Sequence, residues 1–333
     1  MAETNQRILL KARPEGRPGP EHFELAEAPR PSPGTGEVLV RHRFLSLDPY
    51  MRGRMDDAPS YAAPVALGEV MTGECVGEVV ESRHPDFAPG DWVGGARGWQ
   101  RWSAAHGSTL VKLPAMEGVP PSAFLGVLGM PGTTAWVGVT EIGRVRPGET
   151  FVVSAASGAV GGVAGQIAKR MGARVIGIAG GPEKCRYVKE ELGFDDCLDH
   201  RQDLPAALAS ACPGGIDVYF ENVGGAVQAA VFPRMTHFGR IVFCGTVAAY
   251  NTRPLPPGPN LADVVRKRLR LEGFIVSDHP RAFATWRERG AAWVRDGSLH
   301  WREDIVHGLE RAPEAFIGLL DGKNFGKLVV AID

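Results

Sequence analysis

Residues 151–180, FVVSAASGAVGGVAGQIAKRMGARVIGIAG, are the most informative part of this sequence about its fold. Its first residues, Phe151–Ala155, are mostly β-branched or apolar and predict a strand. A run of small residues follows, then a predicted helix over Gly161–Met171 and a second predicted strand over Arg174–Ala179. A strand, a glycine turn, a helix and a strand in this order are typical of a dinucleotide-binding unit.

The turn between the first strand and the helix has the spacing Ala156-x-Gly158-x-x-Gly161. Gly158 would let the backbone approach a pyrophosphate, and the N-terminus of the helix would stabilise its charge. Gly161 would allow the helix to pack closely on the strand. We expect Ala159 and Val160 of the same turn to contact the dinucleotide. Ala156 stands where the usual fingerprint has its first glycine, so an ordinary strand–helix turn is the alternative.

The residues after the second strand favour NADP over NAD. An NAD site usually carries Asp or Glu at the tip of this strand, where the acid binds the ribose 2′-hydroxyl. Here the strand ends in Gly180 and Gly181, and Lys184 and Arg186 follow in the first turn of the next helix. A cation there would meet a 2′-phosphate, although Glu183 beside them complicates this interpretation. The sequence therefore predicts NADPH as the cofactor.

Strands and helices alternate on both sides of this stretch. The segment Ala123–Ile142 is predicted to be helical, interrupted at Gly129–Thr134. Further elements are expected after residue 180: helices over Pro182–Leu192 and Ala226–Met235, and strands over Ile216–Glu221, Gly239–Gly245 and Leu269–Val276. Such alternation is typical of an α/β fold with a doubly wound parallel sheet, the Rossmann fold.

The first 120 residues or so predict a separate β domain. Short valine-rich segments, Glu37–Phe44, Gly73–Ser82 and Gly90–Gly95, are separated by proline and glycine. The last segment, Lys323–Ile332, is a single strand with no helix after it and is expected to return to this domain. We therefore expect a discontinuous β-barrel domain over residues 1–122 and 300–333, and a Rossmann domain over residues 123–299.

Composition excludes several classes of function. Lys and Arg total 37 against 38 Asp and Glu, a net charge of −1, which argues against a nucleic-acid binder. No stretch reaches the 18 or so apolar residues of a membrane span, and the first residues lack the apolar core of a secretion signal. The five cysteines are scattered without a CxxC pair, as in free thiols of a reducing compartment. We expect a cytoplasmic protein that binds neither nucleic acid nor membranes.

The β domain offers no metal-ligand spacing. Its only cysteine is Cys75, and His42, His84 and His106 are scattered along it. A catalytic zinc needs a Cys, His and acid set with an open position. The sequence therefore predicts no metal site.

Seven motifs occur in one order along the chain, and together they resemble the zinc-independent branch of the medium-chain dehydrogenase/reductases. Within that branch the resemblance is to the group of prostaglandin reductases, plant double-bond reductases and bacterial curcumin reductases, and it spans essentially the whole chain. The motifs are SLDPYMRGRM (46–55), LGMPGTTAW (128–136), AASGAVGGVAGQIAK (155–169), FENVGG (220–225), CGTVAAYN (244–251), PLPPGP (254–259) and GKNFGKLVV (322–330).

The resemblance implies an NADPH-dependent reductase of carbon–carbon double bonds conjugated to a carbonyl, acting by hydride transfer to the β-carbon. It implies a GroES-like catalytic domain beside the Rossmann domain, an enone or enal substrate, and a homodimer. By position, Lys184 is the lysine that binds the 2′-phosphate. Asn222 and Asn324 match cofactor-binding residues, and Met130 and Thr134 of LGMPGTTAW are expected at the cofactor as well.

The resemblance also implies the residues around the nicotinamide and the substrate. Cys244 and Gly245 end a strand near the nicotinamide. Tyr250 matches a tyrosine that hydrogen-bonds the substrate carbonyl or orients the nicotinamide ribose, which makes it the expected catalytic residue. Tyr50 and Met51 of DPYMR would line the substrate cleft.

One segment departs from the family pattern. Relatives often have Tyr in an NYK or DYK segment as a second partner of the adenosine phosphate, whereas this chain has Asp199-His200-Arg201. His200 or Arg201 could take the role of that tyrosine. Two other functions stay open: a quinone reductase of the same architecture, and a non-catalytic NADPH-binding sensor.

Overall fold

The computed structural model describes residues 4–255 and 257–332, and the chain divides into two compact units. The first unit runs through Leu125 and includes Glu303–Asn324 and the residues from Leu328 onward. The second unit comprises Gly126–Arg302 and Phe325–Lys327. Among the described residues, no helix is both long and apolar enough to cross a bilayer.

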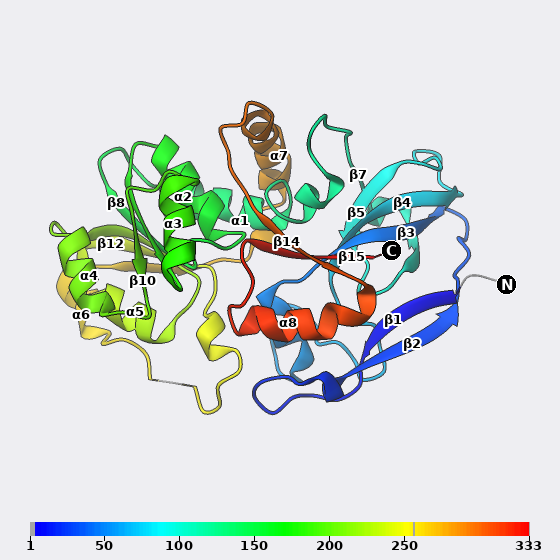
Figure 1. The fold of residues 1–333 in the computed structure, drawn as a ribbon, viewed down its shortest axis with the longest axis horizontal. Helices are drawn as coiled ribbons and strands as arrows, with labels where there is room; N and C mark the ends of the chain where they lie inside the picture. The colour runs from blue at the N-terminus through cyan, green and yellow to red at the C-terminus, as the bar shows by residue number, and fades with distance from the viewer. Residues whose placement is uncertain (1–3, 256, 333) are drawn as a thin grey trace. The chain divides into compact units, whose positions relative to one another are not determined.

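The second unit is built on a six-stranded sheet with the order β10-β9-β8-β11-β12-β13, in which neighbouring strands are parallel (Figure 1). This is the strand order of a doubly wound Rossmann fold, and that fold was predicted from the alternation of elements. The order reverses between β8 and β11, and ligands of such sheets bind outside the carboxyl ends of the strands at that point. The strands are β8 (Thr150–Ser154), β9 (Arg174–Ala179), β10 (Asp196–Asp199), β11 (Ile216–Glu221), β12 (Met235–Phe243) and β13 (Arg270–Gly273).

Helices cover this sheet and bury its apolar side chains. Helix α2 (Gly161–Arg170) packs on β8 and β9, and α3 (Pro182–Glu190) packs on β9 and β10. The buried core includes Val152, Ile176 and Tyr219 from three of the strands. The remaining helices are α1 (Met130–Val137), α4 (Leu204–Ala211), α5 (Gly225–Val231), α6 (Ala262–Lys267) and α7 (Pro280–Arg295).

Several predicted boundaries in this unit are wrong. Helix α5 ends at Val231 and not at Met235, β12 begins at Met235 and not at Gly239, and β13 ends at Gly273 and not at Val276. The first helix of the unit was expected to be interrupted at Gly129–Thr134, but α1 begins at Met130 inside that segment. The chain bends just before it, where the backbone N–H groups of Gly129 and Gly132 both donate to the carbonyl oxygen of Gly126, at 3.1 Å each. Pro131 therefore stands in the first helical turn, where its missing N–H costs no intrahelical hydrogen bond.

The first unit is a β domain. Strands β1 (Thr4–Leu10) and β2 (Phe23–Pro29) form an antiparallel pair. A seven-stranded sheet has the order β14-β15-β3-β4-β5-β7, with β6 also paired to β3. Its strands are β3 (Glu37–Ser46), β4 (Glu74–Ser82), β5 (Trp92–Ala96), β6 (Trp102–His106), β7 (Val111–Lys112), β14 (Glu303–His307) and β15 (Lys327–Ala331).

The C-terminal strand completes this sheet. Strand β15 pairs antiparallel with β3, with Val329 opposite Ser46, so the end of the chain joins the strand that follows the N-terminal hairpin. Helix α8 (Ala312–Leu320) closes the core of the unit through Phe316, whose ring meets the ring of Trp99 edge-on at 5.6 Å.

Candidate functional site

The predicted phosphate turn connects β8 to α2 and is tightly folded. The Gly158 N–H donates to the Ala155 carbonyl at 2.9 Å, and the Gly162 N–H donates to the Gly158 carbonyl at 3.0 Å. A Cβ at Gly161 would lie 2.4 Å from the Ala155 oxygen, which no side chain can occupy. Only glycine therefore allows α2 to begin this close to β8, and the N-terminus of the helix lies directly after the turn.

The alanine at the first position of the fingerprint is accommodated by a second glycine. Ala156 is fully buried, and its N–H donates to the Ile178 carbonyl of β9 at 3.0 Å. A Cβ at Gly177 would lie 2.8 Å from the Ala156 Cβ. Gly177 thus leaves the space that Ala156 fills, and the turn keeps its shape without the usual glycine.

The corner after β9 is surrounded by basic side chains. A Cβ at Gly180 would lie 2.9 Å from His200 Nε2, and one at Gly181 would lie 3.0 Å from Arg201 Nη1. Both side chains come from the residues that follow β10. Lys184 lies in the first turn of α3 beside the same corner and is half-buried. The structure thus brings together Gly180, His200 and Arg201, three residues that the sequence singled out.

Asp199 organises this corner, a role that the sequence did not predict. Its Oδ1 accepts hydrogen bonds from the backbone N–H groups of Gly181 at 2.9 Å and Arg201 at 3.0 Å. Burial raises the pKa of Asp199, but the two N–H donors and the charges of Arg201 and His200 outweigh it and lower the pKa below its usual value. The carboxylate therefore stays ionised and holds the chain that carries the cations.

A second buried carboxylate, Glu221, lies at the end of β11. Its Oε1 accepts hydrogen bonds from the Tyr219 hydroxyl at 2.9 Å, the Ser154 hydroxyl at 3.1 Å, and the backbone N–H groups of Val223 at 2.7 Å and Gly224 at 2.9 Å. The side chain is completely buried. It connects the carboxyl ends of β8 and β11 at the point where the strand order reverses. Glu221 ends an apolar strand in FENVGG, but nothing in the local sequence distinguishes it from an ordinary acid.

The predicted nicotinamide residues gather around these strand ends. The Asn222 side-chain amide donates to the Ser154 carbonyl at 2.8 Å. The N–H groups of Cys244 and Gly245 donate to the Glu221 carbonyl at 3.0 and 3.1 Å. Burial and the Glu221 charge raise the pKa of the Cys244 thiol to about 12, so this thiol stays protonated at neutral pH.

Tyr250 reaches the same place from the turn that follows β12. A Cβ at Gly245 would lie 3.1 Å from the Tyr250 hydroxyl oxygen and 3.6 Å from the Asn222 carbonyl oxygen. Glycine at position 245 thus leaves a bare backbone surface beside a phenol. Part of the neighbouring PLPPGP motif, residue 256, lies outside the described residues.

Met130 and Thr134 lie at the start of α1, one helical turn apart. The Thr134 hydroxyl donates to the Met130 carbonyl at 2.8 Å, and its oxygen lies 3.5 Å from the Met130 sulfur. Thr134 is buried and Met130 is half-buried. The hydroxyl is therefore engaged by its own helix, and contact of either residue with a cofactor stays a prediction.

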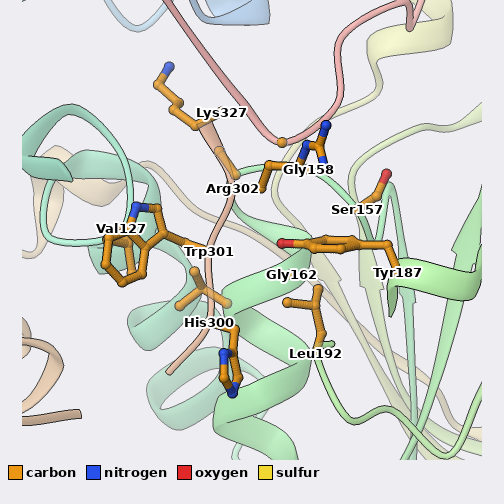
Figure 2. A pocket seen from close by; sticks show the side chains of 13 residues that line it. Val127, Ser157, Gly158, Gly162, Tyr187, Leu192, His300, Trp301, Arg302 and Lys327 are labelled. Carbon is orange, nitrogen blue, oxygen red and sulfur yellow. The ribbon is translucent and has the colours of Figure 1, made fainter. Parts of the chain in front are cut away.

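A small pocket lies behind the phosphate turn, as Figure 2 shows. The Tyr187 ring extends into it from α3, and its hydroxyl points away from that helix. Burial, followed by the Glu191 charge, raises the pKa of Tyr187 to about 12, and the nearby Arg302 charge acts in the opposite direction. The pocket is lined by Val127, Ser157, Gly158, Ala159, Gly162, Val163, Tyr187, Leu192, His300, Trp301, Arg302, Gly326 and Lys327.

Three predicted site residues belong to the first unit. Tyr50 lies in a short helical turn, Pro49–Met55, with the Arg54 guanidinium 5.8 Å from its ring centre. Burial and the charge of Asp48 raise the Tyr50 pKa. Met51 is completely buried in the core of the unit, so a contact with substrate stays a prediction for it. Asn324 immediately precedes the segment that belongs to the second unit.

The second unit fits a dinucleotide phosphate. A glycine turn that no Cβ could occupy opens onto a helix N-terminus, and cationic side chains surround the Gly180–Gly181 corner. In the described part of the chain, no group of three or more His, Cys, Asp or Glu side chains could hold a metal ion.

Comparisons with family models match both halves of the chain. The model described as the N-terminal domain of oxidoreductase matches residues 6–113. The model described as zinc-binding dehydrogenase matches residues 159–294, which include the end of the phosphate turn, from Ala159 on, and Tyr250.

Individual relatives match over nearly their whole length. The chain is 51% identical to an NADPH-dependent curcumin reductase of Escherichia coli, over 99% of this chain and 97% of the relative. It is 41% identical to a 2-alkenal reductase (NADP(+)-dependent) of Nicotiana tabacum, over 100% and 99% of the two chains. A crystal structure of CurA from Vibrio vulnificus in complex with NADPH superposes with a TM-score of 0.94, at 46% identity over 98% and 99% of the chains. The chain belongs to the medium-chain dehydrogenase/reductase family, in the group of the curcumin, alkenal and prostaglandin reductases.

Proposed function

We propose that this protein is an NADPH-dependent reductase of the carbon–carbon double bond of α,β-unsaturated ketones and aldehydes. The observation that carries the proposal is the Tyr250 hydroxyl beside the bare backbone of Gly245, at the carboxyl end of the central strands. The relatives named above, a curcumin reductase and an alkenal reductase, support the same substrate class.

The residues of the second unit would bind the cofactor along the strand ends. The α2 N-terminus and the Gly158 turn would hold the pyrophosphate, and Lys184, His200 and Arg201 would surround the 2′-phosphate. Asn222 and Gly245 would border the nicotinamide. Bound NADPH supplies the hydride that the reaction requires.

Tyr250 would act on the substrate oxygen. Addition of hydride to the β-carbon moves electrons to the carbonyl oxygen, and the product forms when the α-carbon takes a proton. A phenol donates a hydrogen bond to that oxygen as its negative charge develops. The β-carbon is already electrophilic through conjugation, so the protein's main task is to orient the substrate and to supply this donor.

The first unit would carry the substrate side of the site, with Tyr50 and Met51 contacting the substrate. In this proposal the GroES-like domain is discontinuous and the Rossmann domain binds the cofactor, as expected from the sequence. Asn324, at the junction of the two units in the chain, would contact the cofactor.

We also propose a cytoplasmic homodimer. Strand β13 is the last strand in the sheet order of the second unit. Three large apolar side chains near it are exposed: Val265 on α6 at 78%, Leu261 just before α6 at 63%, and Phe238 on β12 at 66%. An edge strand and exposed apolar side chains near it are favourable for pairing with a second copy. Light scattering after size exclusion should give twice the 35.7 kDa chain mass; the single-chain mass would contradict the dimer.

The experiment that tests the function is NADPH oxidation with a panel of enones and enals, with NADH, a saturated aldehyde and a simple quinone as controls. We expect turnover of the enones with NADPH, much slower turnover with NADH, and none of the saturated aldehyde. Activity on the saturated aldehyde without activity on enones would overturn the proposal, and activity confined to the quinone would favour the quinone reductase.

A further inference from the structure

Glu221 is a buried acid with one oxygen atom that has no hydrogen-bond partner. Its side chain is 0% exposed, and four donors converge on its Oε1. Its Oε2 is buried as well, and no group of the described residues donates to it or forms an ion pair with the carboxylate. Buried polar atoms nearly always have partners, and a buried charge usually has a counterion. We therefore expect the balancing charge to come from a bound molecule.

The carboxylate lies under the turn that follows β11. The N–H groups of Val223 and Gly224 donate to its Oε1 at 2.7 and 2.9 Å, so the side chain lies at the carboxyl end of its own strand. Asn222 belongs to the same turn, and its side-chain amide donates to the Ser154 carbonyl at 2.8 Å. The charge is therefore held within one turn of a residue that we expect to border the nicotinamide.

The charge also acts at the end of the neighbouring strand β12. The Glu221 carbonyl oxygen accepts the N–H groups of Cys244 and Gly245 at 3.0 and 3.1 Å. Burial, followed by the Glu221 charge, raises the pKa of the Cys244 thiol. A Cβ at Gly245 would lie 3.1 Å from the Tyr250 hydroxyl oxygen. The buried anion is therefore next to the bare backbone beside Tyr250, where the nicotinamide ring would bind.

We propose that Glu221 is the counterion of the oxidised nicotinamide ring, and that its charge makes bound NADPH a stronger hydride donor. The position of the ring rests on the proposed function. The ring is neutral in NADPH and carries a positive charge in NADP+. The hydride leaves it with both electrons of the C–H bond, and the substrate accepts that hydride and a proton. A buried anion beside the ring stabilises the oxidised state and leaves the neutral, reduced state nearly unaffected.

A purely structural role for this carboxylate would have different consequences. If Glu221 only held the turn, its hydrogen bonds with Tyr219, Val223 and Gly224 would matter and its charge would not. Loss of the turn would then weaken NADP+ and NADPH alike, because both carry the same pyrophosphate, riboses and carboxamide. The ratio of the two dissociation constants therefore separates the electrostatic role from the structural one.

The test is a calorimetric titration of the purified full chain with NADP+ and with NADPH at pH 7, without substrate. Glu221→Gln keeps the size of the side chain and removes its charge. We expect the Kd for NADP+ to rise about tenfold relative to the Kd for NADPH. This is the order of effect between unit charges about 10 Å apart at an effective dielectric constant of about 20. It equals a rise of about 30 mV in the reduction potential of the bound cofactor.

Matched variants separate the charge from the hydrogen bonds. Tyr219→Phe removes a donor that lies 2.9 Å from Oε1 and keeps the carboxylate, so the ratio should stay as in the unmodified chain. Asp217→Asn removes a charge, about 13 Å away at the other end of β11, from a side chain that also accepts a backbone N–H, that of Thr150 at 2.9 Å. It should leave the ratio unchanged too. Glu221→Met is the second neutral variant, should the amide of glutamine disturb the turn.

Two results would overturn the inference. One is a ratio that stays unchanged in the neutral variants of Glu221, whether or not both cofactors bind more weakly. The other is a shift in Tyr219→Phe as large as that in Glu221→Gln, which would assign the effect to the hydrogen bonds. Because the titrations contain no enone, a shifted ratio in a chain that reduces no enone would support this inference and refute only the proposed substrate class.

Discussion

Tyr250 carries the chemical part of the proposal, because its hydroxyl is the donor placed beside Gly245. Tyr250→Phe keeps the ring and removes only the hydrogen bond to the developing negative charge. Loss of one such donor costs about a hundredfold in kcat where no other group replaces it, and about tenfold where water or the ribose hydroxyl shares the role. We expect a fall in kcat on an enone with a small change in KM for NADPH. Tyr61→Phe, which alters an exposed tyrosine of the first unit, is the control; an unchanged kcat in Tyr250→Phe would refute its role.

Arg201 tests the cationic corner at the same scale. Its guanidinium lies against Gly181, and Asp199 holds its backbone. Arg201→Gln should raise the KM for NADPH about tenfold and leave that for NADH unchanged, because one charge-assisted hydrogen bond to a phosphate contributes about 1.5 kcal/mol or more. Lys189→Gln removes a positive charge from exposed surface of α3 and should change neither value. Equal losses with the two cofactors would show that Arg201 does not recognise the 2′-phosphate.

At the scale of the element, close packing of α2 depends on glycine. A Cβ at Gly165 would lie 1.8 Å from Phe194 Cζ, so Gly165→Ala must displace that ring or the helix. Overpacking of this kind costs about 1–3 kcal/mol, which exceeds the gain in helix propensity of about 1 kcal/mol. We expect a lower melting temperature by thermal unfolding.

The matched control is Gly318→Ala in α8, where a Cβ would meet only Lys323 at 3.7 Å or more. That substitution should stabilise the protein through helix propensity alone. A higher melting temperature in both variants would show that α2 can move away from Phe194, and the packing argument would fail.

The elements also show what can be predicted from sequence. The βαβ unit was predicted within one residue at each boundary, because three signals agree there: a β-branched run, small residues at a fixed spacing and a helical period. Strand β10 and helix α4 were missed. Strand β10 is only four residues long and has an aspartate at each end, so no period can be recognised in it. Helix α4 is marked mainly by its N-cap, since the Asp203 side chain accepts the Ala206 N–H.

The candidate site divides in the same way. Glycines and the lysine of α3 could be located from sequence because their roles follow from local backbone and charge. Asp199 and Glu221 could not, because each binds backbone groups of segments that meet only after folding: Gly181 is 18 residues from Asp199, and Ser154 is 67 residues from Glu221. A carboxylate that organises strand ends resembles any other acid in the sequence.

For the whole molecule, 37 positive and 38 negative side chains nearly cancel, so overall charge repulsion contributes little to the pH dependence of stability. Individual titratable groups therefore determine how the free energy of unfolding changes with pH. One such group is the buried histidine His42. Its ring nitrogens lie 2.8 Å from the Gln100 carbonyl oxygen and 2.9 Å from the Ser103 hydroxyl oxygen. Burial lowers the pKa of His42 to about 4, with a smaller contribution from Arg97.

The sign of the pH effect follows from this lowered pKa. The unfolded chain protonates this histidine below about pH 6.5, whereas the folded chain keeps it neutral to about pH 4. Between these values the unfolded state binds more protons, so the free energy of unfolding falls as the pH falls, by about 3 kcal/mol in total. Above pH 6.5 the contribution of His42 to the free energy of unfolding is constant.

Urea unfolding at pH 7 and pH 5 should show this loss of stability at the lower pH. His42→Gln should make the loss smaller, whereas His237→Gln, at an exposed position, should leave it unchanged. A pH dependence that is identical in His42→Gln and the unmodified chain would mean that other groups cause the acid sensitivity.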